Sequence, residues 1–336
     1  MSDDAYAQAG VDQGAADSAV ASLVAALGRI ELDRPSRQVP LPGHYASVIR
    51  IDERTGIALS TDGVGTKLLV AEQLGRFETV GIDCVAMNVN DVICVGAEPL
   101  AMLDYIAIER ADPEVCEQIG VGLARGAELA GVEIPGGELA QLGDLVRGFD
   151  LTGACFGTVA LDAIVDGSAV EPGDAVIGLP SNGIHSNGYT LARSALEGLA
   201  LDEDPEGRLG RTLGDALLEP TQIYVRPVLE LLRSPVDVRG LAHITSGGLG
   251  NLLRLAAAVG YEIDDPLPPQ PIFELIGERA GVEGDEMHRV FNMGCGFCCV
   301  VAASDEEAAV GILRGHCPGA RRIGRASAAV GEISRA

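Results

Sequence analysis

The succession of an apolar strand, a glycine-containing loop and a helix occurs three times in this chain, and it constrains the fold more than any other feature. The loops are STDGVGTK (60–67), SNGIHSNGY (181–189) and TSGG (245–248). Glycines let backbone N–H groups approach phosphate oxygens, and the helix that follows adds partial positive charge at its N-terminus. The succession predicts an α/β fold, mixed α+β in each half, that binds an anion at these loops.

A length of 336 residues is enough for two domains of ordinary size. The segment DGSAVEPGD (166–174) separates the halves, which predicts an N-terminal domain of 1–166 and a C-terminal domain of 167–336. A fourth glycine-rich stretch, PGGELAQ (135–141), is expected to form a turn. The periodicity predicts further elements: a helix from Ala16 with Asp17 or Ser18 as N-cap, an extended linker over 33–44, helices over about 80–95, 221–233 and from the TSGG loop to 259, and a buried strand over 296–303.

The formal net charge is −25, and such a surface repels nucleic-acid phosphates and anionic membranes. We therefore expect no nucleic-acid and no membrane partner. No apolar run approaches the roughly 18–20 residues of a membrane span, and the acidic start MSDDAYAQAG is unlike a signal peptide. Eight scattered cysteines suit a reducing compartment, so we expect a soluble cytoplasmic protein.

Three of the cysteines, Cys295, Cys298 and Cys299, lie close together in FNMGCGFCCVVAA. Their spacing is compatible with a metal or redox site, but no second pair at ligand spacing accompanies them. The second half of the segment has the pattern of a buried strand, which favours core packing.

Lys67 is the only lysine in the chain; the other basic residues are arginines. A lysine is a compact charge that fits among phosphate oxygens, whereas arginine presents a wide planar fork. Its place in the STDGVGTK loop makes Lys67 a candidate phosphate cation, and the alternative is a polar residue placed there by chance.

The expected helix over 80–95 carries a narrow polar rim of Asp83, Asn90 and Asp91 on an otherwise apolar surface. Such a rim could hold a divalent cation or orient a substrate. Equally, it could face solvent or cap neighbouring loops. With Asp62 and Glu138 near other glycine stretches, the carboxylates suggest nucleotide phosphates clamped by Mg2+.

Of the five histidines, His185 and His243 lie beside glycine loops and are candidates for acid–base work or phosphate contacts. A loop-structuring hydrogen bond is the alternative for each. His44, His288 and His316 are expected at the surface. The chain has no P-loop, no dinucleotide-binding glycine motif, no Gly-x-Ser-x-Gly and no HExxH, so the common nucleophilic and zinc hydrolases are excluded.

Longer segments resemble the phosphoribosylformylglycinamidine cyclo-ligase (aminoimidazole ribonucleotide synthetase) family over nearly the whole chain. The segments are YAQAGVD (6–12), TDGVGTK (61–67), VGIDCVAMNVNDVICVGAEPLAMLDYIA (80–107), PSNGIHSNGYTL (180–191), LLEPTQIYVRPVLELL (217–232), AHITSGGLGNLLR (242–254) and FNMGCG (291–296).

The resemblance implies a two-domain fold whose N-terminal, ATP-binding domains pair in a homodimer. It implies that ATP and Mg2+ activate the formyl oxygen of formylglycinamidine ribonucleotide as an iminophosphate, which an amidine nitrogen attacks to close the imidazole. Carried over to this sequence, the metal and ATP-phosphate residues are Asp62, Asp91 and Glu138, with Asn90 and the cradle of Gly63, Gly65, Thr66 and Lys67. The substrate contacts are His185, Ser186, Asn187, His243 and Thr245.

The sequence departs from the family pattern at three places, one of which is TSGG (245–248) where the family has TGGG. RPSRQVPLPGH stands where a glycine-rich loop is usual, and GGELAQLGD (136–144) replaces GGETAEMPG. These departures keep other hypotheses open: a related ATP-using enzyme, such as a selenophosphate synthetase, a thiamine-phosphate kinase or a hydrogenase maturation factor, or a catalytically silent nucleotide-binding member.

Overall fold

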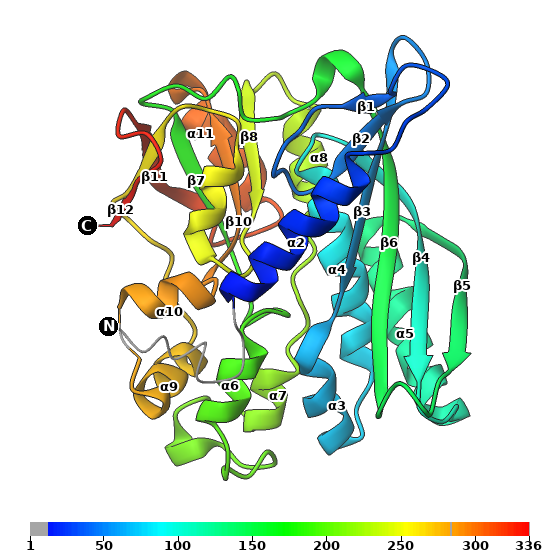
Figure 1. Cartoon of the computed structure of the whole chain (residues 1–336). Helices are drawn as coiled ribbons and strands as arrows, with labels where there is room; N and C mark the ends of the chain where they lie inside the picture. Colours follow the sequence, from blue (N-terminus) through cyan, green and yellow to red (C-terminus); the bar gives the residue numbers. More distant parts are fainter. Residues whose placement is uncertain (1–12, 283, 336) are drawn as a thin grey trace.

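Two six-stranded sheets lie side by side in a computed structural model of the chain, which describes residues 13–282 and 284–335 (Figure 1). The strands of the first sheet lie within residues 38–160 and those of the second within residues 175–335. The mixed α/β fold predicted from the loops is thus confirmed, and the change of sheet falls at the expected boundary segment. The segment YAQAGVD (6–12) lies outside the described residues.

The first sheet is antiparallel except for its last pair, β4 and β5, which run parallel. Its strands, in spatial order, are β1 (Gln38–Val39), β2 (Ser47–Arg50), β3 (Thr55–Gly63), β6 (Phe149–Ala160), β4 (Glu98–Ile108) and β5 (Glu133–Gln141).

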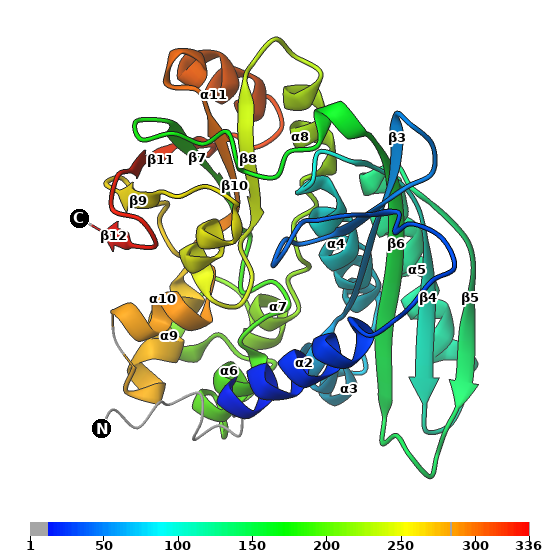
Figure 2. The ribbon, with the colours of Figure 1, turned by 45° about the horizontal axis from the view of Figure 1, so that its top comes forward.

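Two long helices, α4 (Glu78–Ile93) and α5 (Pro113–Ala130), cover one face of this sheet (Figure 2). They approach each other closely because Gly81 and Gly122 lie at their contact. A Cβ on Gly122 would overlap the carbonyl oxygen of Glu78, and one on Gly81 would lie 2.5 Å from that of Ile119. The 3-10 turn η1 (Gly65–Lys67) and helix α3 (Leu68–Leu74) connect β3 to α4.

In the second sheet, strand β10 lies between β7 and β8, and all of its residues are buried. Its strands, in spatial order, are β12 (Ile333–Arg335), β9 (Gly260–Ile263), β11 (Arg321–Ser327), β7 (Ala175–Pro180), β10 (Cys295–Val301) and β8 (Val238–His243). Cys295, Cys298 and Cys299 pack within this core, as the strand pattern predicted. Among the described residues there is no group of three or more side chains able to hold a metal.

The helices of the second half are short. They are α6 (Tyr189–Ala195), α7 (Leu213–Leu217), α8 (Val225–Leu232), α9 (Pro271–Ala280), α10 (Asp285–Val290) and α11 (Glu306–Arg314), with 3-10 turns η2 (Leu161–Ala163), η3 (Pro205–Gly207), η4 (Gly248–Arg254) and η5 (Ala303–Asp305). Over the part of the chain that the structure describes, no helix combines the length and apolarity needed to cross a bilayer.

Three sequence predictions of local structure are wrong. Residues 135–141 do not form a turn but belong to edge strand β5, where Gly137 makes room for the Asp104 side chain on β4. Residues 221–224 precede α8, because their backbone is bonded by side chains of α4. The helix after the TSGG loop is the 3-10 turn η4, which ends at Arg254. The predicted extended linker over 33–44 includes the short strand β1, which does not contradict the prediction.

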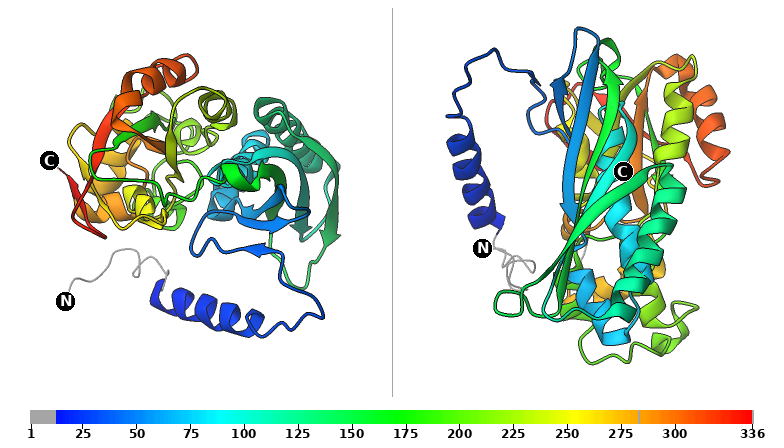
Figure 3. Two further views of the ribbon diagram at one scale, coloured as in Figure 1. Left: turned by 90° about the horizontal axis from the view of Figure 1, so that it is seen from above. Right: turned by 90° about the vertical axis from the view of Figure 1, so that its right-hand side faces the viewer.

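Helix α2 (Gln13–Leu27) stands apart from both sheets (Figure 3). It begins before the predicted start at Ala16. Its apolar residues are more than half exposed: Val20, Leu23, Val24 and Leu27.

Candidate active site

The polar rim of α4 faces the second half of the chain, where it caps one loop. Asp83 Oδ1 accepts hydrogen bonds from the backbone nitrogen and the hydroxyl of Thr221, at 2.7 and 2.6 Å. Asn90 Nδ2 donates to the carbonyl of Gln222 (2.9 Å), and its Oδ1 accepts from the backbone nitrogen of Tyr224 (2.9 Å). Of the two interpretations left open, loop capping holds for Asp83 and Asn90.

Lys67 is fully buried, and its ammonium has a partner for each of its three protons. Nζ lies 2.7 Å from Asp83 Oδ2 and donates to the carbonyls of Glu219 (2.6 Å) and His185 (3.1 Å). Burial lowers the pKa of Lys67, and the charge of Asp83 opposes this effect. The structure does not support the predicted phosphate contact of Lys67, because no face of the ammonium is open to a ligand.

His185 has a left-handed backbone conformation, with φ of 66°, which is uncommon outside glycine. Both of its ring nitrogens are buried without a hydrogen-bond partner in the described part of the chain. Burial, reinforced by His243 and Lys67, holds the pKa of His185 well below its usual range, so the ring is neutral at pH 7. Buried polar atoms are normally paired, so these nitrogens indicate a ligand position.

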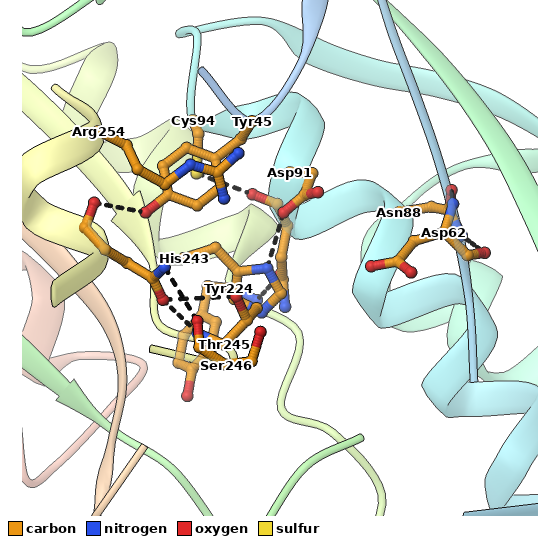
Figure 4. A network of polar contacts seen from close by, with 12 residues as sticks. Tyr45, Asp62, Asn88, Asp91, Cys94, Tyr224, His243, Thr245, Ser246 and Arg254 are labelled. Atoms are coloured by element: carbon orange, nitrogen blue, oxygen red, sulfur yellow. Dashed lines mark hydrogen bonds and ion pairs between the residues drawn. The ribbon is translucent and has the colours of Figure 1, made fainter. Parts of the chain in front are cut away.

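His243, at the end of β8, is joined to α4 by a 2.9 Å hydrogen bond from Nδ1 to Asp91 Oδ1 (Figure 4). The carboxylate accepts, so Nδ1 carries the proton of this hydrogen bond and Nε2 points away from Asp91. Nε2 is also buried and has no partner among the described residues. Asp91 and His243, which the sequence analysis treated separately, therefore form one hydrogen-bonded pair.

Asp62 lies at the end of β3 beside Asn88 of α4, which accepts from its backbone nitrogen (3.0 Å) and donates to its carbonyl (3.1 Å). Burial, followed by the charge of Asp91, raises the pKa of Asp62. The negative charge of Asp91 acts on Asp62, and a divalent cation near Asp62 would offset it. The predicted role of Asp62 and Asp91 in holding Mg2+ stays a prediction.

The next residues form the loop that the sequence predicted to cradle phosphates. Asp62 Oδ1 accepts from the backbone nitrogen of Gly63 (2.8 Å). Gly65 has φ of 72°, and both Gly65 and Thr66 are exposed. Backbone N–H groups of an exposed glycine loop can bind an anion. Phosphate binding by this loop therefore stays a prediction.

Glu138 is not brought to Asp62 and Asp91. Glu138 is the register partner of Tyr105, on the face of the first sheet that the helices leave open. Asp62 is the register partner of Gly153 and lies on the opposite face, because a Cβ on Gly153 would point at Asn88 of α4. Two strands separate β5 from β3. At about 4.8 Å per strand spacing, this distance is too large for shared coordination within one subunit. Glu138 lines a different cavity, of about 440 Å³, with Thr61, Tyr105 and Thr152.

The remaining predicted substrate residues lie in the second half near His185 and His243. Ser186 Oγ lies 3.1 Å from the hydroxyl of Thr221, and Asn187 Nδ2 is buried without a partner among the described residues. The backbone nitrogen of Thr245 donates to Asn251 Oδ1 (2.9 Å). Three of the four glycine-rich stretches thus lie near one another where the two halves of the chain meet, a region that we call the seam. The fourth stretch, 135–141, does not lie there.

Comparison with known proteins matches both halves of the chain to one family. The N-terminal domain of AIR synthase related protein matches residues 43–159, and its C-terminal domain matches residues 171–335. A phosphoribosylformylglycinamidine cyclo-ligase of Methanothermobacter thermautotrophicus is 50% identical over 92% of this chain and 90% of its own. The chain belongs to the AIR synthase (phosphoribosylformylglycinamidine cyclo-ligase) family. The cyclo-ligase of Pyrococcus furiosus, also 50% identical, matches 92% of this chain and 91% of its own.

Solved structures share the fold at lower identity. The hydrogenase maturation protein HypE in complex with ATP has a TM-score of 0.63 at 21% identity, over 85% of this chain and 83% of its own. A thiamine-monophosphate kinase from Stenotrophomonas maltophilia has a TM-score of 0.64 at 18% identity, over 89% of this chain and 91% of its own.

This AIR synthase family member has one further contact at the seam that the sequence did not predict. The guanidinium of Arg254 lies 4.0 Å from the ring centre of Tyr45 and donates to the carbonyls of Gly43 (2.9 Å) and His44 (3.2 Å). Tyr45 Oη donates to the carbonyl of Asn251 (3.0 Å). The available signal was a single arginine among the leucines that follow the TSGG loop.

The expectation that His44 and His288 lie at the surface is wrong. Both ring nitrogens of His44 are buried without partners in the described residues, because the linker folds onto η4. Burial, with Arg254, lowers the pKa of His44 to about 4. His288 is half-buried, and burial lowers its pKa as well. His316 is exposed, as predicted.

Proposed function

We propose that the protein is a phosphoribosylformylglycinamidine cyclo-ligase. It uses ATP to close the ring of formylglycinamidine ribonucleotide, giving 5-aminoimidazole ribonucleotide, ADP and phosphate, in purine biosynthesis. Relatives with this name align at about 50% identity along about nine-tenths of both chains. Such similarity over both domains supports the cyclo-ligase over the related ATP-using enzymes and over a silent member.

The observation that carries the proposal in this structure is the set of buried, unpartnered ring nitrogens on His185 and His243. Among the described residues these nitrogens have no partner, and they lie on the loop over 181–189 and at the end of β8, where the second half meets α4 and the exposed glycine loop. His185 is neutral, so its ring can accept a hydrogen bond at one nitrogen and donate one at the other without carrying charge. Asn187 adds a buried amide with no partner in the described chain, and Ser186 and Thr245 flank the same position.

On the other side of the seam, Gly63, Gly65 and Thr66 present the backbone toward the ATP phosphates. Asp62 and Asp91 would hold Mg2+, which supplies charge stabilisation to the phosphates when bound. Phosphoryl transfer to the formyl oxygen and attack by the amidine nitrogen need no covalent protein nucleophile. The contribution of the protein is therefore positioning and charge stabilisation.

We also propose that the protein is a homodimer paired through the open face of the first sheet. Large apolar side chains on this sheet are 36–47% exposed: Leu59, Leu100, Leu103, Tyr105 and Phe156. Exposed apolar side chains on the face that α4 and α5 leave uncovered suit a protein interface. A second subunit on this face would also cover the cavity of Glu138. The eight free cysteines are in keeping with a cytoplasmic location.

The test of the activity is direct. Purified protein with ATP, Mg2+ and formylglycinamidine ribonucleotide should form 5-aminoimidazole ribonucleotide and ADP in equal amounts, with none formed when Mg2+ is chelated. A protein that instead phosphorylates thiamine phosphate, or that binds ATP without turnover, would contradict the proposal.

A further inference from the structure

Lys67 connects three segments that are distant in the sequence. Its ammonium lies between Asp83 of α4, the carbonyl of Glu219 in the loop before α8, and the carbonyl of His185 in the SNGIHSNGY loop. Neither the lysine nor the aspartate side chain is exposed. Breaking a buried ion pair of this kind is costly, because either charge would be left alone in the interior.

The contact with His185 is made at an unusual backbone position. A histidine with φ of 66° is held there by its surroundings, since the left-handed region is unfavourable for a residue with a Cβ. Lys67 Nζ donates to the carbonyl of this same residue at 3.1 Å. On the ring side, Gly296 of β10 leaves room, because a Cβ there would overlap Tyr224 Oη and lie 2.6 Å from His185 Cε1. Lys67 thus bonds the backbone of His185, and Gly296 leaves the space that the ring occupies.

The Asp83 carboxylate also connects to Ser186, the next residue of the loop over 181–189, through Thr221. Asp83 uses Oδ2 for Lys67 and Oδ1 for Thr221, and the Thr221 hydroxyl lies 3.1 Å from Ser186 Oγ. One carboxylate therefore orders Lys67 and Ser186 through short, buried contacts. The contacts thus connect α4 to His185 and Ser186, two consecutive residues of the loop that we propose binds the substrate.

We propose that Lys67 is a positioning residue that sets the conformation of His185 and Ser186, rather than a cation that binds ATP phosphate. The proposal rests on the proposed function only for the identity of the substrate. It explains why a lysine is needed: a single compact ammonium reaches one carboxylate and two carbonyls that converge from different directions, which the planar fork of arginine does not match.

The test compares wild type with Lys67→Met, with the charge-neutral pair Lys67→Met/Asp83→Asn, and with Arg76→Met. Arg76 is the control because it also pairs with the second half, at Asp215 (2.7 Å), but its ion pair is exposed. Thermal stability is measured first. Three further quantities are then measured: kcat/KM for formylglycinamidine ribonucleotide, the Kd of a non-hydrolysable ATP analogue, and hydrogen exchange of the peptide over 181–189.

We expect the double variant to regain most of the thermal stability that Lys67→Met loses, since no charge is left unpaired in the interior. Its kcat/KM should stay at least about 10-fold below wild type, as for a misplaced catalytic group. The ATP-analogue Kd should stay within about twofold, and exchange over 181–189 should be faster. Arg76→Met should match wild type in all three.

Two results would overturn the proposal. A Kd for the ATP analogue that is at least about 10-fold weaker, with exchange over 181–189 unchanged, would return Lys67 to the phosphate role. Recovery of both kcat/KM and exchange in the double variant would show that the pair only balances charge. If wild-type protein makes no aminoimidazole ribonucleotide, the proposed function fails, and exchange and analogue binding still decide the role of Lys67.

Discussion

His243 Nδ1 lies 2.9 Å from Asp91 Oδ1, so a hydrogen bond joins the two halves of the chain at the candidate active site. The aspartate holds the proton on Nδ1 and leaves Nε2 for a ligand. An asparagine at position 91 could present either its oxygen or its NH2 group to the ring, which would no longer fix the tautomer.

Asp91→Asn should therefore lower kcat by about 10²-fold, in the range of lost acid–base function, with loss of Mg2+ binding adding to the effect. The measurement is steady-state formation of aminoimidazole ribonucleotide. His316→Gln is the control, because His316 is exposed and bonds Glu230 at the surface (2.6 Å). Its activity should equal wild type. An Asp91→Asn variant as active as the control would reduce the pair to a contact between domains.

Gly296→Ala should destabilise the protein by about 3 kcal/mol, because the new methyl group overlaps Tyr224 and displaces His185 in a closely packed interior. Urea unfolding measures the change. Gly250→Ala is the matched control: no atom lies within 4 Å of its Cβ position. That variant should keep or gain up to about 1 kcal/mol of unfolding free energy. Equal effects of the two substitutions would mean that the room beside His185 is not needed.

Acid should weaken the fold partly through His44. Its pKa is about 4 in the folded chain and 6.5 when unperturbed, so between these values the unfolded chain binds a proton that the folded chain does not. The free energy of unfolding must fall as the pH falls through this window. From pH 7 to about pH 4.5, wild type should lose about 2 kcal/mol more than His44→Gln. Urea unfolding at both pH values tests this, and parallel losses would contradict it.

Leu103→Glu should convert the proposed homodimer to a monomer, because the substitution places a charge within the exposed apolar face of the first sheet. Sedimentation or light scattering gives the mass. Leu145→Glu adds the same charge at a leucine that is 82% exposed outside this sheet, and it should leave the mass unchanged. A Leu103→Glu protein of unchanged mass would move the interface elsewhere or show that there is none.

The sequence by itself determined the elements that depend on local periodicity. The apolar pattern with its polar rim predicted α4, and the continuous apolar run placed the three cysteines in buried strand β10. Family membership was also available at this level, because the matching segments are long and run through both domains. These signals are local, since each depends on neighbours a few residues apart.

Only the tertiary structure decided which groups meet. Lys67 and His185 are 118 positions apart and Asp91 and His243 are 152 apart, so no local spacing encodes either contact. The same rim residues could have faced solvent, a metal or a loop, and the packing of the second half selected the loop for Asp83 and Asn90. Glu138 was predicted beside Asp62, yet the alternation of side chains along β5 places it on the opposite face of the sheet. A buried ammonium needs several acceptors from different directions, and only the folded chain brings them together around Lys67.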